Sequence, residues 1–272
     1  MSSGLASFLI EPEELLASDD TVVVDTRRPA EYATGHIPGA ISFSSYDMLV
    51  KSTSEIGLNR FRRAMEALYG DAGIDAGHPV VVYESQMGMR AARECFLLQH
   101  VGHPNVRILN GGLVAWQQAG GGISTNASMR PPTVFSGMPS LGRVIDVRGI
   151  LGQTGMLGFE LIDVRTAEEF TGTDGVSCCA RQGRIPGARR IEWNRFFDKE
   201  TGRFLPPNAI RGLLAEQGIS PDGEIVVYCH RGARSAIAYY ALLHAGCLRV
   251  RNFIGSWHEW AARNDLPVET GE

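Results

Sequence analysis

The sequence predicts an α/β protein built from two tandem copies of one fold, each a mainly parallel sheet with helices on both faces. Four sequence blocks occur twice along the chain in the same order, which indicates an internal repeat. Short continuous Val/Ile runs alternate with segments whose apolar residues recur at helical spacing. Such runs are typical of strands buried on both faces, as in a parallel sheet covered by helices. The length of 272 residues fits two domains, because a domain usually holds about 100–150 residues.

The repeated blocks are an Asp-x-Arg element, a Gly-x-Ile-Pro-Gly-Ala element, a strand that ends in tyrosine, and a glycine-containing element with tryptophan. Their paired copies lie at 25–27 and 163–165, 35–40 and 183–188, 80–83 and 225–228, and 111–116 and 255–260. The second copy carries an insertion of ten residues between Phe170 and Gly183. We expect an N-terminal domain over 1–120, a linker rich in Gly, Ser, Pro and Thr over 121–140, and a C-terminal domain over 141–272.

Each copy is expected to alternate strands and helices. Strands are expected at 21–24 and 80–83 in the first copy, and at 160–162 and 225–228 in the second. The spacing of apolar residues predicts a helix in each copy, at Leu58, Phe61, Met65, Leu68 and Tyr69 and at Ile210, Leu213 and Leu214. A further helix is expected to begin near Arg234.

Composition and charge argue against several classes of protein. The formal net charge of −4 disfavours a general nucleic-acid binder, and no apolar run approaches the roughly 20 residues of a membrane-spanning helix. Five cysteines are few for this length, so a disulfide framework is not expected. The apolar stretch at 5–10 is short and has no basic residue before it, unlike a secretory signal. We therefore expect a reduced, cytoplasmic protein whose partners include neither nucleic acid nor membrane.

One loop carries residues suited to covalent chemistry. The strand at 225–228 is followed by Cys229, His230, Arg231, Gly232, Ala233 and Arg234. Ligands of open α/β sheets bind beyond the carboxyl ends of the strands, where a helix N-terminus offers free backbone N–H groups. Gly232 allows the loop to curl around an anion, and Arg231 and Arg234 add positive charge. Because such a setting lowers the pKa of a thiol, we expect Cys229 to be a thiolate nucleophile rather than a core cysteine.

The size of the loop separates two chemistries. Thiolate-dependent phosphatases have one residue more between the cysteine and the arginine than the four residues between Cys229 and Arg234. The shorter loop leaves less room for a phosphoryl group and suits a single sulfur atom held on Cys229 as a persulfide. The count favours sulfur transfer, with a Cys-dependent phosphatase as the weaker alternative.

The four ordered blocks and the cysteine loop resemble the two-domain rhodanese family of thiosulfate and 3-mercaptopyruvate sulfurtransferases, over nearly the whole chain. The resemblance implies a catalytic C-terminal domain, an active site near the interdomain cleft, and no need for a metal or an organic cofactor. In the first copy Glu84 stands where the second copy has Cys229. A carboxylate cannot accept a sulfane sulfur, so the N-terminal domain is expected to be catalytically silent.

The mechanism that this resemblance implies is a two-step relay through a covalent intermediate. The Cys229 thiolate would take the outer sulfur of thiosulfate and release sulfite, and cyanide, a small thiol or a thiol protein would then remove the sulfur. Because His230 and Arg231 make the loop more cationic, the dianion thiosulfate is favoured as donor over the monocarboxylate 3-mercaptopyruvate. A 3-mercaptopyruvate sulfurtransferase and a persulfide carrier for a protein partner remain alternatives.

Two further features of the second copy allow two interpretations each. Arg181 and Arg184 belong to a group of four arginines within ten residues. They could bind the anionic end of the donor, or they could lie on a solvated loop face. Cys178 and Cys179 lie in the insertion, where they could accept sulfur or resolve the intermediate, or have no role in the reaction.

Overall fold

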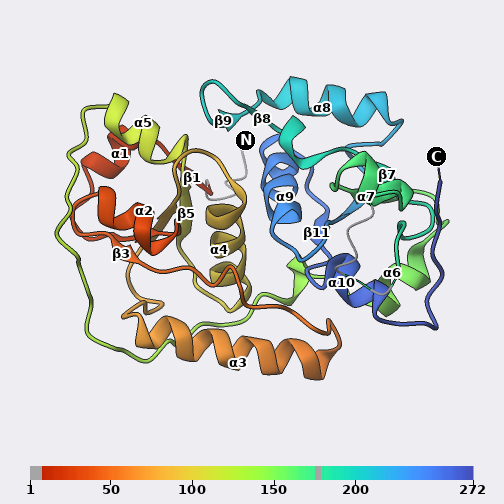
Figure 1. Ribbon diagram of the computed structural model, residues 1–272, viewed down its shortest axis with the longest axis horizontal. Coiled ribbons are helices and arrows are strands. Elements are labelled where there is room, and N and C mark those ends of the chain that lie inside the picture. The colour runs from red at the N-terminus through yellow and green to blue at the C-terminus, as the bar shows by residue number, and fades with distance from the viewer. Residues whose placement is uncertain (1–7, 175–178, 180, 272) are drawn as a thin grey trace. The chain divides into compact units, whose positions relative to one another are not determined.

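The computed structural model describes residues 8–174, 179 and 181–271 (Figure 1). The chain forms two compact units: residues 1–47, 62–140 and 197–204 make up the first, and residues 48–61, 141–196 and 205–272 the second. The segments 48–61 and 197–204 therefore each group with the opposite half of the chain.

The first unit contains a wholly parallel five-stranded sheet with the strand order β1-β5-β4-β2-β3. Its strands are β1 (Leu9–Ile10), β2 (Val22–Asp25), β3 (Ile41–Ser42), β4 (Val80–Tyr83) and β5 (Val106–Leu109). The helices are α1 (Pro12–Leu16), α2 (Pro29–Thr34), most of α3 (Glu55–Asp71), α4 (Met89–His100) and α5 (Gly112–Gln118). A short antiparallel pair, β8 (Phe197–Asp198) and β9 (Arg203–Phe204), also belongs to this unit.

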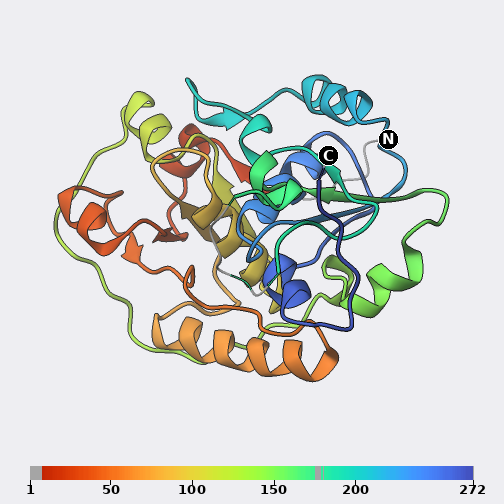
Figure 2. The ribbon, with the colours of Figure 1, turned by 45° about the vertical axis from the view of Figure 1, so that its right-hand side comes forward.

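The second unit contains a wholly parallel four-stranded sheet with the order β11-β10-β6-β7. Its strands are β6 (Phe159–Asp163), β7 (Arg189–Arg190), β10 (Glu224–Tyr228) and β11 (Val250–Asn252). The α-helices are α6 (Val147–Gln153), α7 (Ala167–Thr171), α8 (Pro207–Glu216), α9 (Arg234–His244) and α10 (Ser256–Ala261). Helix α9 packs on β10 and β11 (Figures 1 and 2).

The predicted fold class is confirmed in both units. The strands expected from the Val/Ile runs correspond to β2, β4, β6 and β10, and the expected helices correspond to α3 and α8. The helix expected near Arg234 is α9, which begins at that residue. Over the described residues, no helix has the combined length and apolar character needed to cross a bilayer.

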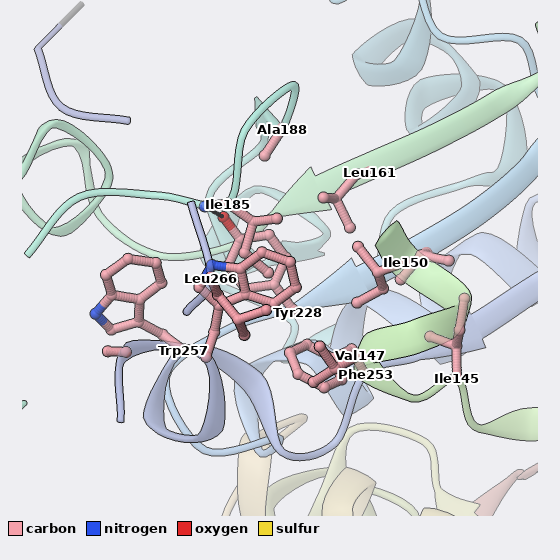
Figure 3. Close-up of a cluster of buried hydrophobic side chains, with 13 residues drawn as sticks. Ile145, Val147, Ile150, Leu161, Ile185, Ala188, Tyr228, Phe253, Trp257 and Leu266 are labelled. Atoms are coloured by element: carbon pink, nitrogen blue, oxygen red, sulfur yellow. Dashed lines mark hydrogen bonds between the residues drawn. The ribbon is translucent and has the colours of Figure 1, made fainter. Parts of the chain in front are cut away.

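Both faces of the second sheet are covered. Successive side chains of a strand point to opposite faces, and Ile225 to Tyr228 in β10 are all fully buried. Figure 3 shows the cluster on one face, in which Tyr228 and Leu161 lie with Phe253, Trp257 and residues of α6. The other face of β10 is covered by α9. Buried on both sides, β10 holds the residue that follows it in a fixed position.

One hydrogen-bond network explains three of the four repeated blocks. In the second unit Arg165 makes a bidentate ion pair with Asp163, with Nη2 to Oδ2 at 2.6 Å, and donates to the carbonyl of Gly183 at 2.7 Å. The hydroxyl of Tyr228, at the end of β10, accepts from the backbone N–H of Ile185 at 3.1 Å. The Asp-x-Arg element, the Gly-x-Ile-Pro-Gly-Ala element and the strand-end tyrosine are thus bound to one another.

The first unit repeats this network atom for atom. Arg27 pairs with Asp25 and donates to the carbonyl of Gly35 at 2.7 Å, and Tyr83 accepts from Ile37 at 3.1 Å. Because the network occurs in both copies, including the copy without the cysteine, it accounts for the shared fold and not for the chemistry.

Candidate active site

Cys229 lies at the carboxyl end of β10, between the neighbouring strands β6 and β11. The loop that follows turns at Gly232, whose φ of +84° lies in the left-handed region that favours glycine. Helix α9 then begins at Arg234, with Ala233 as its N-cap residue. The Cys229 side chain is only 1% exposed, so the cysteine lies at the bottom of this loop.

The loop supplies hydrogen bonds to the cysteine sulfur. The backbone N–H of Gly232 donates to the Sγ of Cys229 at 3.1 Å. Burial by itself raises the pKa of Cys229, but the charge of Arg234 and hydrogen bonds from Ser235 and from the backbone of Arg231 outweigh it, so the pKa is lowered. A thiolate at this position is a more effective nucleophile than an ordinary thiol, which is mostly protonated at neutral pH.

The two loop arginines have different surroundings. Arg231 is exposed at the surface of the loop. Arg234 makes a bidentate ion pair with Glu169 of α7, with distances of 2.6 and 2.7 Å, and both side chains are largely buried. Glu169 therefore balances part of the positive charge near Cys229. The sequence analysis did not identify Glu169 as a candidate site residue.

His230 borders a small pocket in the second unit. The pocket is lined by Arg165, Glu169, Cys179, Arg181, His230 and Trp257, among others. Burial, together with the charges of Arg231 and Arg234, lowers the pKa of His230 to about 4. The imidazole is therefore neutral at pH 7, and its Nε2 lies 3.5 Å from the Sγ of Cys179.

The two arginines that were candidates for donor binding contact the protein itself. Arg181 donates to the carbonyls of Trp260, Ala261, Arg263 and Leu266, at and after the end of α10. Arg184 donates to the carbonyl of Gly271 and pairs with Glu269 at 3.3 Å. Neither interpretation offered for these arginines anticipated these contacts. Arg181 also lines the pocket, and a role in binding the donor stays a prediction for both.

Ser256 is a site residue that the sequence analysis missed. Its hydroxyl accepts the backbone N–H of Cys229 at 3.2 Å, donates to the carbonyl of Phe253 at 2.9 Å and lies 3.9 Å from the cysteine sulfur. Among the described residues it is the only non-glycine with positive φ, at +54°. The equivalent position in the first copy is Gly112, with φ of +63°. The sequence signal that could have identified Ser256 is this difference between the two copies of a repeated block, with serine in the second copy where the first has glycine.

The loop of the first copy has a carboxylate in place of the thiol. Glu84 follows β4, and its Oε1 accepts the backbone N–H groups of Arg90 and Ala91, at 2.9 and 3.1 Å, in the first turn of α4. Burial raises the pKa of Glu84 to about 7 despite these hydrogen bonds. The helix N-terminus of the first copy is therefore capped by the protein's own carboxyl group.

Of the two cysteines in the insertion, Cys178 lies outside the described residues, and Cys179 lies half-buried in the pocket. Cys95 and Cys247 are buried, and among the described residues no disulfide joins Cys95, Cys179, Cys229 or Cys247. Within the described part of the chain, no three His, Cys, Asp or Glu side chains are grouped so as to hold a metal ion.

The chain is similar to known sulfurtransferases and to a sulfur carrier protein over most of its length. The chain is 33% identical to a thiosulfate sulfurtransferase of Azotobacter vinelandii over 268 residues, which is 96% of each chain. It is 30% identical to the sulfur carrier protein TtuD of Thermus thermophilus, covering 89% of this chain and 87% of that protein.

Among solved structures, the fold matches that of the anaerobic ergothioneine biosynthesis enzyme from Chlorobium limicola with a TM-score of 0.83 and 25% identity, over 97% of this chain and 70% of that one. The model of the rhodanese-like domain matches twice, at residues 11–119 and 144–263. The chain therefore belongs to the rhodanese family of sulfurtransferases, with one rhodanese-like domain in each half.

Proposed function

We propose that this protein transfers the outer sulfur of thiosulfate, through a persulfide on Cys229, to a thiophilic acceptor such as cyanide or a thiol. The observation that carries the proposal is the hydrogen-bonded Cys229 sulfur beside the start of α9, with its pKa lowered mainly by Arg234. The thiosulfate sulfurtransferases among its relatives support the same donor.

The reaction proceeds in two displacements. The Cys229 thiolate attacks the outer sulfur of thiosulfate, the S–S bond of the donor breaks, and sulfite leaves with its electron pair. The N–H groups of Gly232 and its neighbours stabilise negative charge on the sulfur that remains, and Arg231 and Arg234 favour the dianionic donor. Arg181 and Arg184 can add positive charge that attracts the same donor. An acceptor thiolate or cyanide then removes the sulfane sulfur and restores the Cys229 thiolate.

The first unit is proposed to be catalytically silent. Glu84 occupies the position of the nucleophile and accepts the N–H groups that an anionic sulfur would otherwise need. The proposed reaction needs Cys229 as a reduced thiol, so we propose that the protein acts in the reducing cytoplasm.

A persulfide carrier is the second candidate function. It is favoured by one relative, which is named a sulfur carrier protein. A carrier would load sulfur on Cys229 stoichiometrically but would release it to small acceptors only slowly. An enzyme would turn over many times.

The test is to incubate the reduced chain with thiosulfate or 3-mercaptopyruvate, locate added sulfur by mass spectrometry and measure thiocyanate formation with cyanide. We expect one sulfur on Cys229, turnover with cyanide and a higher kcat/KM for thiosulfate. Cys229→Ser should abolish both signals, whereas Cys247→Ser, a matched change at a buried cysteine, should leave them intact. Loading of sulfur without turnover would favour the carrier, and hydrolysis of an aryl phosphate without thiocyanate would favour the phosphatase.

A further inference from the structure

We propose that Cys179 is a second sulfur-carrying residue, which takes the sulfane sulfur from Cys229 and presents it to the acceptor. This inference rests on the proposed persulfide at Cys229 and adds a further step within the same unit. It gives a role to the insertion that distinguishes the second copy from the first.

The position of Cys179 supports this role. Its Sγ lies 3.5 Å from the Nε2 of His230, the residue that directly follows Cys229. Cys179 and His230 line the same pocket. Cys179 is half-buried, whereas Cys229 is 1% exposed. Sulfur on Cys179 would therefore be open to acceptors that are too large to reach the bottom of the cysteine loop.

Arg181, two residues after Cys179, is held firmly by hydrogen bonds. Its guanidinium donates to four backbone carbonyls, including those of Trp260 and Leu266. The indole N–H of Trp257 donates back to the carbonyl of Arg181 at 3.2 Å. The end of the insertion is thereby tied to α10, whose first turn also bonds the cysteine loop, since the N–H of His258 donates to the carbonyl of His230 at 3.0 Å.

The chemistry of the step balances without an oxidant or a reductant. The Cys179 thiol, hydrogen-bonded to the Nε2 of neutral His230, releases its proton to water, and the resulting thiolate attacks the outer sulfur of the Cys229 persulfide. A new S–S bond forms on Cys179 while the S–S bond to Cys229 breaks, and Cys229 leaves as a thiolate. The lowered pKa of Cys229 makes it the better leaving group.

The experiment follows sulfur from thiosulfate labelled with a heavy isotope at the outer atom. The reduced full-length chain is mixed with the donor, quenched at intervals by alkylation while still folded, and then digested with trypsin. Trypsin separates the cysteines, since Cys178 and Cys179 fall in peptide 166–181, Cys229 in 212–231 and Cys247 in 235–249. Fragmentation of the first peptide, together with the variant Cys178→Ser, distinguishes the two adjacent cysteines.

We expect the label on Cys229 first and on Cys179 afterwards, with none on Cys247. Cys229→Ser should lose both labels, and Cys179→Ser or Cys179→Ala should keep the label on Cys229 alone. Cys178→Ser should behave as the wild type. His230→Ala should slow the labelling of Cys179 about fivefold, as expected when a hydrogen bond worth about 1 kcal/mol no longer orients its thiol, without preventing that of Cys229.

Other labelling results would refute either the relay or the proposed function. Label on Cys229 that never reaches Cys179 would refute the relay and leave the proposed function intact, whereas failure to label Cys229 would refute the proposed function itself. Labelling of Cys179 in the Cys229→Ser variant, or of Cys178 in place of Cys179, would also overturn the relay. An unchanged rate in His230→Ala would show that the hydrogen bond between Cys179 and His230 does not contribute to the relay.

Discussion

Ser256 offers the sharpest test of how the fold positions the nucleophile, because strain and hydrogen bonding can be separated there. Its backbone has a φ of +54°, a conformation that costs an L-residue with a side chain about 1–2 kcal/mol. Its hydroxyl accepts the backbone N–H of Cys229. Replacing the side chain by Gly or by Ala removes the same hydrogen bond, but only glycine relieves the strain.

The two variants should therefore differ in stability and agree in activity. We expect Ser256→Gly to be about 1 kcal/mol more stable than Ser256→Ala, after allowance of about 0.5–1 kcal/mol for the conformational entropy of glycine. For a chain of this size that difference corresponds to about 2–4 °C in Tm. Both should lower kcat/KM for thiosulfate about fivefold, as expected when a hydrogen bond worth about 1 kcal/mol no longer fixes the nucleophile.

The measurements are thermal unfolding and the rate of persulfide formation on the same preparations. If Ser256→Gly kept wild-type activity while Ser256→Ala lost it, activity would follow backbone strain, and the reasoning about the hydroxyl would be wrong. Equal stability of the two variants would show that the backbone relaxes at this position.

Three other substitutions test the electrostatics of the chain. Glu169→Gln leaves Arg234 without its counter-charge, so the pKa of Cys229 should fall further, and the pH profile of alkylation of Cys229 should shift to lower pH. Asp163→Asn breaks a buried ion pair and should lower the free energy of unfolding in urea by about 3 kcal/mol, with any loss of activity following the loss of folded protein. Burial raises the pKa of Glu84 from 4.5 to about 7, so the folded state holds the proton more tightly than the unfolded state. Stability should therefore fall, by up to about 3 kcal/mol, as the pH rises from about 4.5 to about 7. In Glu84→Gln this part of the pH dependence of urea unfolding should disappear, and a profile identical to the wild type would contradict the raised pKa.

The local elements could be predicted from the sequence because their signals are local. Runs of Val and Ile at 80–83 and 225–228 mark strands buried on both faces, and the order of Cys229, Gly232 and Arg234 marks a strand, a turn and a helix start. These features depend on residues that are neighbours along the chain. The fold class followed from the same patterns and from their repetition.

The partners of the loop could not be predicted, because they come from elements distant in the sequence. Glu169 reaches Arg234 from α7, 65 residues earlier, and Ser256 bonds to Cys229 from the start of α10, 27 residues later. Charge alone allowed two interpretations of Arg181, a donor-binding residue or part of a solvated loop face, and neither indicated that its guanidinium donates to backbone carbonyls. A backbone carbonyl leaves no trace in the sequence, so contacts of this kind become visible only in the structure.

The carboxylate of Glu84 has a consequence for ligand stoichiometry. A chain with two copies of one fold suggests two equivalent anion sites, but in the first copy the backbone N–H groups of Arg90 and Ala91 are already occupied by a carboxyl group that cannot diffuse away. Glu84 is there a tethered competitor with a high effective concentration. A titration with sulfite or thiosulfate should therefore saturate at one anion per chain, and every kinetic effect of such anions can be assigned to the second copy.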